Sequence, residues 1–85
     1  MTGMLATSLA GHDKGTLYYI LKSDGENVDL ADGRIRTIEH PKHKKCKHIQ
    51  LIKERQEELI ALGESGKLRN EDIKRVLKAR QKRPV

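Results

Sequence analysis

The sequence predicts a mainly β protein, a small five-stranded barrel followed by a C-terminal helical hairpin. In the first half, apolar residues alternate in short runs separated by glycine-containing turns, which is the pattern of half-buried strands. In the second half, apolar residues recur at helical spacing among good helix formers. A chain of 85 residues has room for one small core. We therefore expect the barrel over residues 1–52 and a basic helical extension over residues 53–85.

Five short strands are expected in the first half of the chain. Asp32-Gly33 predicts a two-residue hairpin turn before the fourth strand, because both central positions of such a turn need φ > 0. The segment 40–45 is interpreted as a loop, since Pro41 has no N–H to donate to a central ladder. Closing these strands into a barrel would leave no free sheet edge. The expected strands are Met4–Leu9, Thr16–Leu21, Val28–Leu30, Arg34–Ile38 and Cys46–Leu51.

The second half is expected to form two helices. Gly63 and Gly66 end the first of them. Asn70 is the predicted N-cap of the second, because the acidic residues that follow it suit the positive end of a helix dipole. The second helix has an apolar stripe on one side and basic residues on the other. The residues concerned are Ile52, Leu59, Ile60 and Leu62 in the first helix, and Ile73, Val76 and Leu77 opposite Lys74, Arg75, Lys78 and Lys82 in the second.

Composition narrows the class of protein. The chain carries 18 Lys and Arg against 12 Asp and Glu, a net charge of +6 at pH 7. Its single cysteine, Cys46, excludes a secreted disulfide scaffold and favours a reducing cytoplasm. No apolar run approaches the roughly 18–20 residues of a membrane span, and no signal peptide is visible at the N-terminus. We therefore expect a cytoplasmic monomer with no membrane role.

The positive charge is concentrated in two blocks. Residues 1–39 carry four bases against six acids, whereas residues 40–53 carry five lysines and no acid. Residues 54–85 carry nine bases against six acids. Binding to a polyanion depends on such local concentration, because each phosphate contact releases local counterions. The alternative is a solvated basic face with no ligand.

The segment from Leu5 to Leu21 combines two strands with a loop bounded by Gly11 and Gly15. Glycines at both ends permit positive φ and the close approach of another backbone. Lys14 places a cation beside the N–H groups of the loop, an arrangement that suits phosphate. The alternative interpretation is a tight hairpin in which Lys14 is merely solvated.

Two motifs resemble a known family. Gly11-x-Asp13-Lys14-Gly15 between two apolar strands resembles the KOW motif of ribosomal proteins and transcription elongation factors. The segments Ala31-Asp32-Gly33-Arg34-Ile35-Arg36 and Glu39-x-Pro41-Lys42-x-Lys44-Lys45 are similar to the short bacterial KOW-domain RNA-binding proteins, which are related to a family of archaeal and eukaryotic large-subunit ribosomal proteins. The resemblance covers residues 4–51. It implies an SH3-like barrel that binds structured RNA, with ribosomal RNA as the expected partner.

The candidate RNA-binding residues come from the motif loop, the mid-chain basic block and the last helix. The chain has no Trp or Phe and only two tyrosines, which argues against a platform of aromatic side chains stacked on unpaired bases. Contacts to phosphates, 2′-hydroxyls and helical shape fit better. The residues expected to contact RNA are Gly11, His12, Lys14 and Gly15, then Arg34, Arg36, Lys42, His43, Lys44, Lys45 and Lys47, and finally Lys74, Arg75 and Lys78.

Some residues of the chain could also serve functions other than RNA binding. His40-x-x-His43-x-x-Cys46-x-His48 contains possible zinc ligands, but lysines surround it and the spacing lacks a paired knuckle, so no metal or other cofactor is expected. No nucleophile with its base and orienting acid appears, so no catalysis is expected. The alternative function is a protein-interaction module in transcription or translation, whose barrel contacts a polymerase or a ribosomal protein. The helices could pack on the barrel, bind RNA or bind a partner protein.

Overall fold

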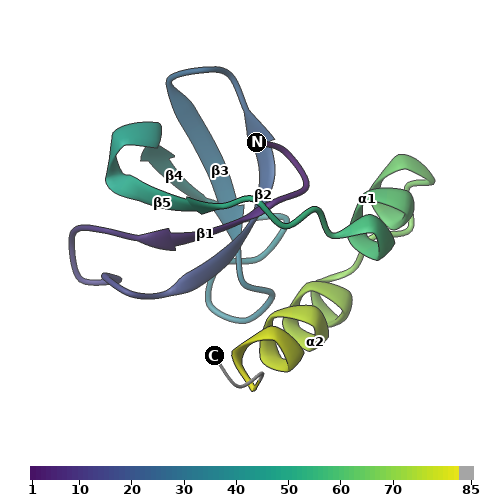
Figure 1. Cartoon of the computed structure of the whole chain (residues 1–85). Coiled ribbons are helices and arrows are strands. Elements are labelled where there is room, and N and C mark those ends of the chain that lie inside the picture. Colours follow the sequence, from purple (N-terminus) through teal and green to yellow (C-terminus); the bar gives the residue numbers. More distant parts are fainter. Residues whose placement is uncertain (83–85) are drawn as a thin grey trace.

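The structure is a computed structural model that describes residues 1–82, so the last three residues of the predicted helical extension lie outside the described part. It is mainly β, with a five-stranded antiparallel sheet and two C-terminal helices (Figure 1), as the sequence predicts. The elements are β1 (Leu5–Ser8), β2 (Leu17–Ser23), β3 (Asn27–Ala31), β4 (Lys42–Lys45), a 3₁₀ turn (Cys46–His48), β5 (Ile49–Ile52), α1 (Glu57–Glu64) and α2 (Asn70–Gln81).

The strands lie in the order β4-β3-β2-β1-β5, so β4 and β5 are the two edges of the sheet. These edge strands are consecutive in the chain and only the turn Cys46–His48 separates them. The sheet must therefore curl until its edges approach each other, because the four residue steps from Lys45 to Ile49 span at most about 14 Å. Among residues 1–82, β4 pairs with β3 and β5 pairs with β1, and no ladder joins β4 to β5. The sheet is not closed, and the predicted barrel is not confirmed.

The predicted strand Arg34–Ile38 is wrong, and so is the two-residue hairpin before it. One carboxylate oxygen of Asp32 accepts the backbone N–H groups of Arg34 and Arg36, each at 2.9 Å. The N–H groups of Asp32 and Gly33 both donate to the Arg36 carbonyl. Hydrogen bonds to the Asp32 side chain thus take the place of strand-to-strand hydrogen bonds, and the segment forms a local loop. Asp side chains commonly compete with sheet hydrogen bonds in this way.

The basic segment predicted as a loop forms an edge strand. Lys42–Lys45 pairs with β3, with Lys44 opposite Val28. Pro41 immediately precedes β4, where the missing N–H interrupts no ladder, and prolines are tolerated at edges for this reason. The predicted strand Cys46–Leu51 begins only at Ile49, after the 3₁₀ turn.

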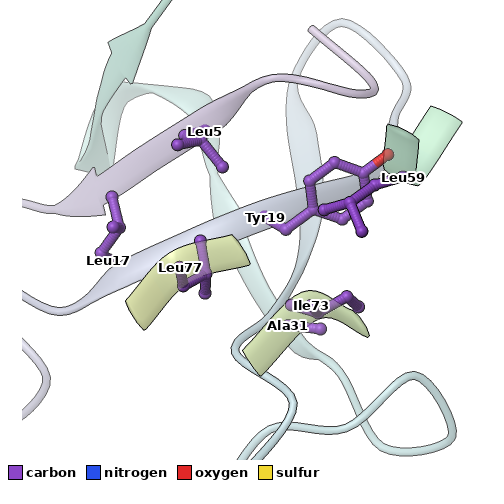
Figure 2. Close-up of a cluster of buried hydrophobic side chains, with 7 residues drawn as sticks. All are labelled: Leu5, Leu17, Tyr19, Ala31, Leu59, Ile73 and Leu77. Atoms are coloured by element: carbon purple, nitrogen blue, oxygen red, sulfur yellow. The ribbon is translucent and has the colours of Figure 1, made fainter. Parts of the chain in front are cut away.

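Each face of the sheet buries an apolar cluster. On one face, side chains from β1, β2 and β3 meet Leu59 of α1 and Ile73 and Leu77 of α2 (Figure 2). On the other face, the curled strands pack against one another. β2 serves both clusters, since its residues alternate between them. The first cluster contains Leu5, Leu17, Tyr19, Ala31, Leu59, Ile73 and Leu77, and the second contains Ala6, Tyr18, Ile20, Val28, Leu30 and Ile49.

The helices therefore pack on the sheet, which answers a question that the sequence left open. Ile52 belongs to β5 and not to the first helix, which begins at Glu57. Asn70 is not the N-cap of α2, because it is already helical and its side chain serves another segment. Its amide oxygen accepts the Ile38 N–H at 2.8 Å, and its NH₂ donates to Glu39 at 3.0 Å. The start of α2 is thus tied to the loop that follows β3.

Candidate nucleic-acid interface

The loop between β1 and β2 is built around the carboxylate of Asp13. Its Oδ2 accepts a hydrogen bond from the Tyr18 hydroxyl at 2.7 Å. Its Oδ1 lies 2.9 Å from the Ser8 hydroxyl and 3.2 Å from the ammonium of Lys44. Lys44 also donates to the Ala10 carbonyl at 3.1 Å. Because donors from β1, β2 and β4 meet on one carboxylate, they fix the loop against β4.

This network changes two pKa values. Burial by itself raises the pKa of Asp13, but hydrogen bonds from Tyr18, Ser8 and Lys44, with the positive charge of Lys44, outweigh it and lower the pKa from 3.8 to about 2. Burial raises the pKa of Tyr18 above its ordinary value, and the hydrogen bond to the Asp13 carboxylate raises it further. Asp13 is therefore ionised and Tyr18 neutral at physiological pH, so the network stays intact there.

The backbone of the loop is largely bonded to itself and to β1. The N–H groups of Lys14, Gly15 and Thr16 donate to carbonyl oxygens at 3.2, 2.8 and 2.9 Å. The expectation that amides beside Lys14 point outward to a phosphate is wrong for these three groups. The side chains of His12 and Lys14 are exposed, and they are what the loop offers to a ligand.

The loop and the mid-chain basic block lie side by side. The Leu9 N–H donates to the His48 carbonyl at 2.9 Å, which places the 3₁₀ turn against the start of the loop. Lys47 is exposed on this turn, and Lys45 is exposed just before it on β4, opposite Asn27 of β3. Neither lysine makes an ion pair within residues 1–82. The fold thus brings two groups that are separate in the sequence, the loop of residues 11–15 and the turn that carries Lys47, next to each other.

Three other residues of the basic block are less available to a ligand. The side chain of Lys44 is only 10% exposed and is paired with Asp13, so it serves the fold. The His43 side chain is 72% exposed, but its imidazole lies 2.5 Å from a carboxylate oxygen of Asp29 on the neighbouring strand, and that contact competes with a ligand. Lys42 is half-buried on the edge strand.

A groove of about 540 Å³ joins the other end of the β1–β2 loop to α2. Three predicted cations meet in it, Arg34 from the loop after β3 and Lys74 and Lys78 from α2. All three are exposed, and none makes an ion pair within the described residues. In the sequence, Arg34 lies 40 residues before Lys74, and no motif links the two positions. The groove is lined by Thr16, Leu17, Asp32, Arg34, Lys74, Leu77, Lys78 and Gln81.

Two predicted contact residues do not line this groove. Arg75 binds Glu58 of α1, and it lies 3.7 Å from Asp72 on its own helix. The bond to Glu58 raises the pKa of the guanidinium and ties α2 to α1. Arg36 is half-buried at the base of the loop after β3. Thr16 and Gln81 also line the groove, and they were not predicted because their uncharged side chains belong to no motif.

The structure also bears on the possible zinc ligands and on membrane spans. Among residues 1–82, no group of three or more His, Cys, Asp or Glu side chains is arranged to hold a metal ion, the candidate set around Cys46 included. In the same range, no helix has both the length and the apolarity needed to cross a bilayer.

No protein-family model matches the chain, and no curated protein matches it.

Proposed function

We propose that this protein is a non-catalytic RNA-binding protein of the KOW type, associated with the ribosome in the cytoplasm. The observation that carries the proposal is the arrangement of exposed, unpaired cations around the β1–β2 loop. Lys47 lies in the turn beside the start of the loop, and Lys45 lies just before that turn on β4. Lys14 lies on the loop, and Arg34 and the lysines of α2 lie at its other end. A set of cations drawn from four segments suits a phosphate backbone, because each cation can replace a condensed counterion.

The nature of the exposed groups supports structured RNA as the ligand. Tyr18 and Tyr19 are both buried, so neither presents a ring for stacking on an unpaired base. The groove instead offers the cations Arg34, Lys74 and Lys78, together with a hydroxyl from Thr16 and an amide from Gln81. These groups fit recognition of phosphates and 2′-hydroxyls along an RNA helix. The ligand in this proposal is ribosomal RNA, and the protein acts as a monomer.

Two features support an SH3-like barrel as the scaffold. A 3₁₀ turn of three residues joins the two edge strands, which forces the strong curl that such a barrel needs. In addition, the motif residues Gly11 and Asp13 have structural roles here. Gly11 adopts φ 85°, and Asp13 gathers the donors that hold the loop.

The salt dependence of binding tests this function. Lys45→Gln with Lys47→Gln removes two exposed cations without disturbing the Asp13 network. We expect the slope of log K against log salt on an RNA duplex to become shallower by about two units, since each phosphate contact contributes about 0.7–0.9. The matched control is Lys53→Gln with Lys67→Gln, which removes the same charge at exposed positions away from the β1–β2 loop.

Two results would contradict the proposal. If the control pair and the test pair weaken binding equally, the basic surface is not where we place it. If the unmodified protein binds RNA no better than a neutral protein does, the alternative function, a protein-interaction module in transcription or translation, is favoured.

A further inference from the structure

The loop after β3 presents an exposed isoleucine at its tip. Ile35 is 82% exposed, compared with 46% for Leu9 and 40% for Met1. It lies between Arg34 and Arg36 in the sequence. Single exposed apolar side chains are common, but this one stands on a fixed support beside a row of cations.

The base of this loop is rigid for three reasons. Asp32 fixes the tip from within by accepting two backbone N–H groups. Gly33 packs so closely on α2 that a Cβ there would lie 2.3 Å from the Asn70 carbonyl oxygen. The side chain of Asn70 then holds Ile38 on the far side of the tip. Ile35 is thus presented in one position, and binding through it costs little ordering entropy.

The positive charge beside the tip indicates what kind of ligand could contact Ile35. Arg34 lines the same groove as Lys74 and Lys78, so a phosphate strand lying in this groove would pass next to the tip. In an RNA helix the minor groove is wide and shallow, and it exposes riboses and base edges between two phosphate strands. An apolar side chain flanked by cations matches that surface in both shape and charge.

We propose that Ile35 inserts into the minor groove of an RNA helix while Arg34, Lys74 and Lys78 hold one of its phosphate strands. This inference rests on the proposed function, and it adds to that function a contact with no charge. The minor groove of B-form DNA is narrower, so the contact favours RNA over DNA of the same sequence.

Ile35→Ser tests the insertion, because it removes the apolar contact and leaves every charge in place. We expect affinity for an RNA duplex to fall about tenfold through the lost apolar burial. The slope of log K against log salt is expected to stay unchanged, whereas Arg34→Gln should make it shallower. Affinity for the matching DNA duplex should not change with Ile35→Ser. Ala61→Ser, at an exposed position of α1, is the control for a new surface hydroxyl.

A second measurement does not depend on a substitution. In the unmodified protein bound to the RNA duplex, the δ1 methyl group of Ile35 should show nuclear Overhauser effects to ribose protons. The δ1 methyls of the buried Ile20 and Ile73 are internal controls and should show none.

The possible outcomes distinguish a failure of the Ile35 insertion from a failure of RNA binding itself. If Ile35→Ser binds RNA as tightly as the unmodified protein while Lys74→Gln with Lys78→Gln binds weakly, the insertion is wrong and RNA binding stands. If Ile35→Ser weakens DNA and RNA binding equally, the assignment to an RNA minor groove is wrong. If the unmodified protein does not bind RNA at all, both proposals fail.

Discussion

At the scale of single residues, Asp13 has the largest structural role among the motif residues. The sequence marks it only as part of a glycine-bounded loop. In the structure its side chain is 18% exposed and receives donors from three strands. A half-buried carboxylate with this many partners stabilises the fold only while it is ionised.

The first prediction is a pH dependence of stability that Asp13 causes. Its pKa falls from 3.8 to about 2 on folding, so the unfolded chain binds the proton more tightly. The contribution is present in full above about pH 4 and is lost as the pH falls toward 2, and it is on the order of 2 kcal/mol. Urea unfolding between about pH 5 and pH 2 measures it.

Asp13→Asn is the control for this prediction. The amide keeps the shape but does not titrate, so the component of acid destabilisation assigned to Asp13 should disappear. The variant should also be less stable by about 3 kcal/mol at neutral pH, because Lys44 loses its partner while nearly buried. An unchanged acid dependence in Asp13→Asn would show that another carboxyl group is responsible.

At the scale of elements, the contact between the loop after β3 and the start of α2 holds together parts distant in the sequence. Gly33 has a φ of 79°, and its Cα approaches the backbone of Asn70 and Lys74. Both features require glycine, the first through backbone conformation and the second through space. This contact positions Arg34 in the groove with the lysines of α2.

The second prediction separates these two requirements. Gly33→Ala should destabilise the protein by about 3 kcal/mol, since a left-handed alanine costs about 1 kcal/mol and the clash with backbone adds to it. Gly66→Ala is the matched control, because Gly66 has a φ of 71° and no atom within 4 Å of an added Cβ. Thermal and urea unfolding measure both. Equal losses of unfolding free energy in the two variants would mean that the close approach of Gly33 to α2 does not add to the cost of the substitution.

At the scale of the whole molecule, sheet and helices share one of the two apolar clusters. Leu59 and Ile73 are fully buried against β1 and β2, although both belong to the predicted extension 53–85. The helices are also joined to each other and to the segment before α1, where Arg80 binds Glu54 at 2.8 Å. The sheet alone would leave a broad apolar face in water.

The third prediction follows from that shared cluster. A chain ending at Ile52 should fail to unfold cooperatively, because Leu5, Leu17 and Tyr19 lose their cover. Calorimetry and amide dispersion in NMR spectra measure this. A synthetic peptide of residues 53–82 added in trans should restore part of the cooperative transition. A sharp transition in the truncated chain alone would make the sheet an independent domain.

The local order of the fold was predictable from sequence wherever burial repeats at a regular interval. Alternation marks β2, and the helical stripe marks α2, because both periods follow directly from backbone geometry. The mistaken segments are those where single contacts decide the structure. Asp32 turned a predicted strand into a loop, and the edge position of β4 allowed a strand next to Pro41.

By itself, the sequence determined the mainly β class of the fold, the two helices that follow the strands, and the two blocks of positive charge. The tertiary structure decided which charges face a ligand. It turned Lys44 inward to Asp13, joined Arg75 to Glu58, and set Arg34 in one groove with Lys74. The physical reason is that periodicity records burial along a segment, whereas the neighbours of a charged side chain are set across space. In these three cases the neighbour lies 17 to 40 residues away in the sequence.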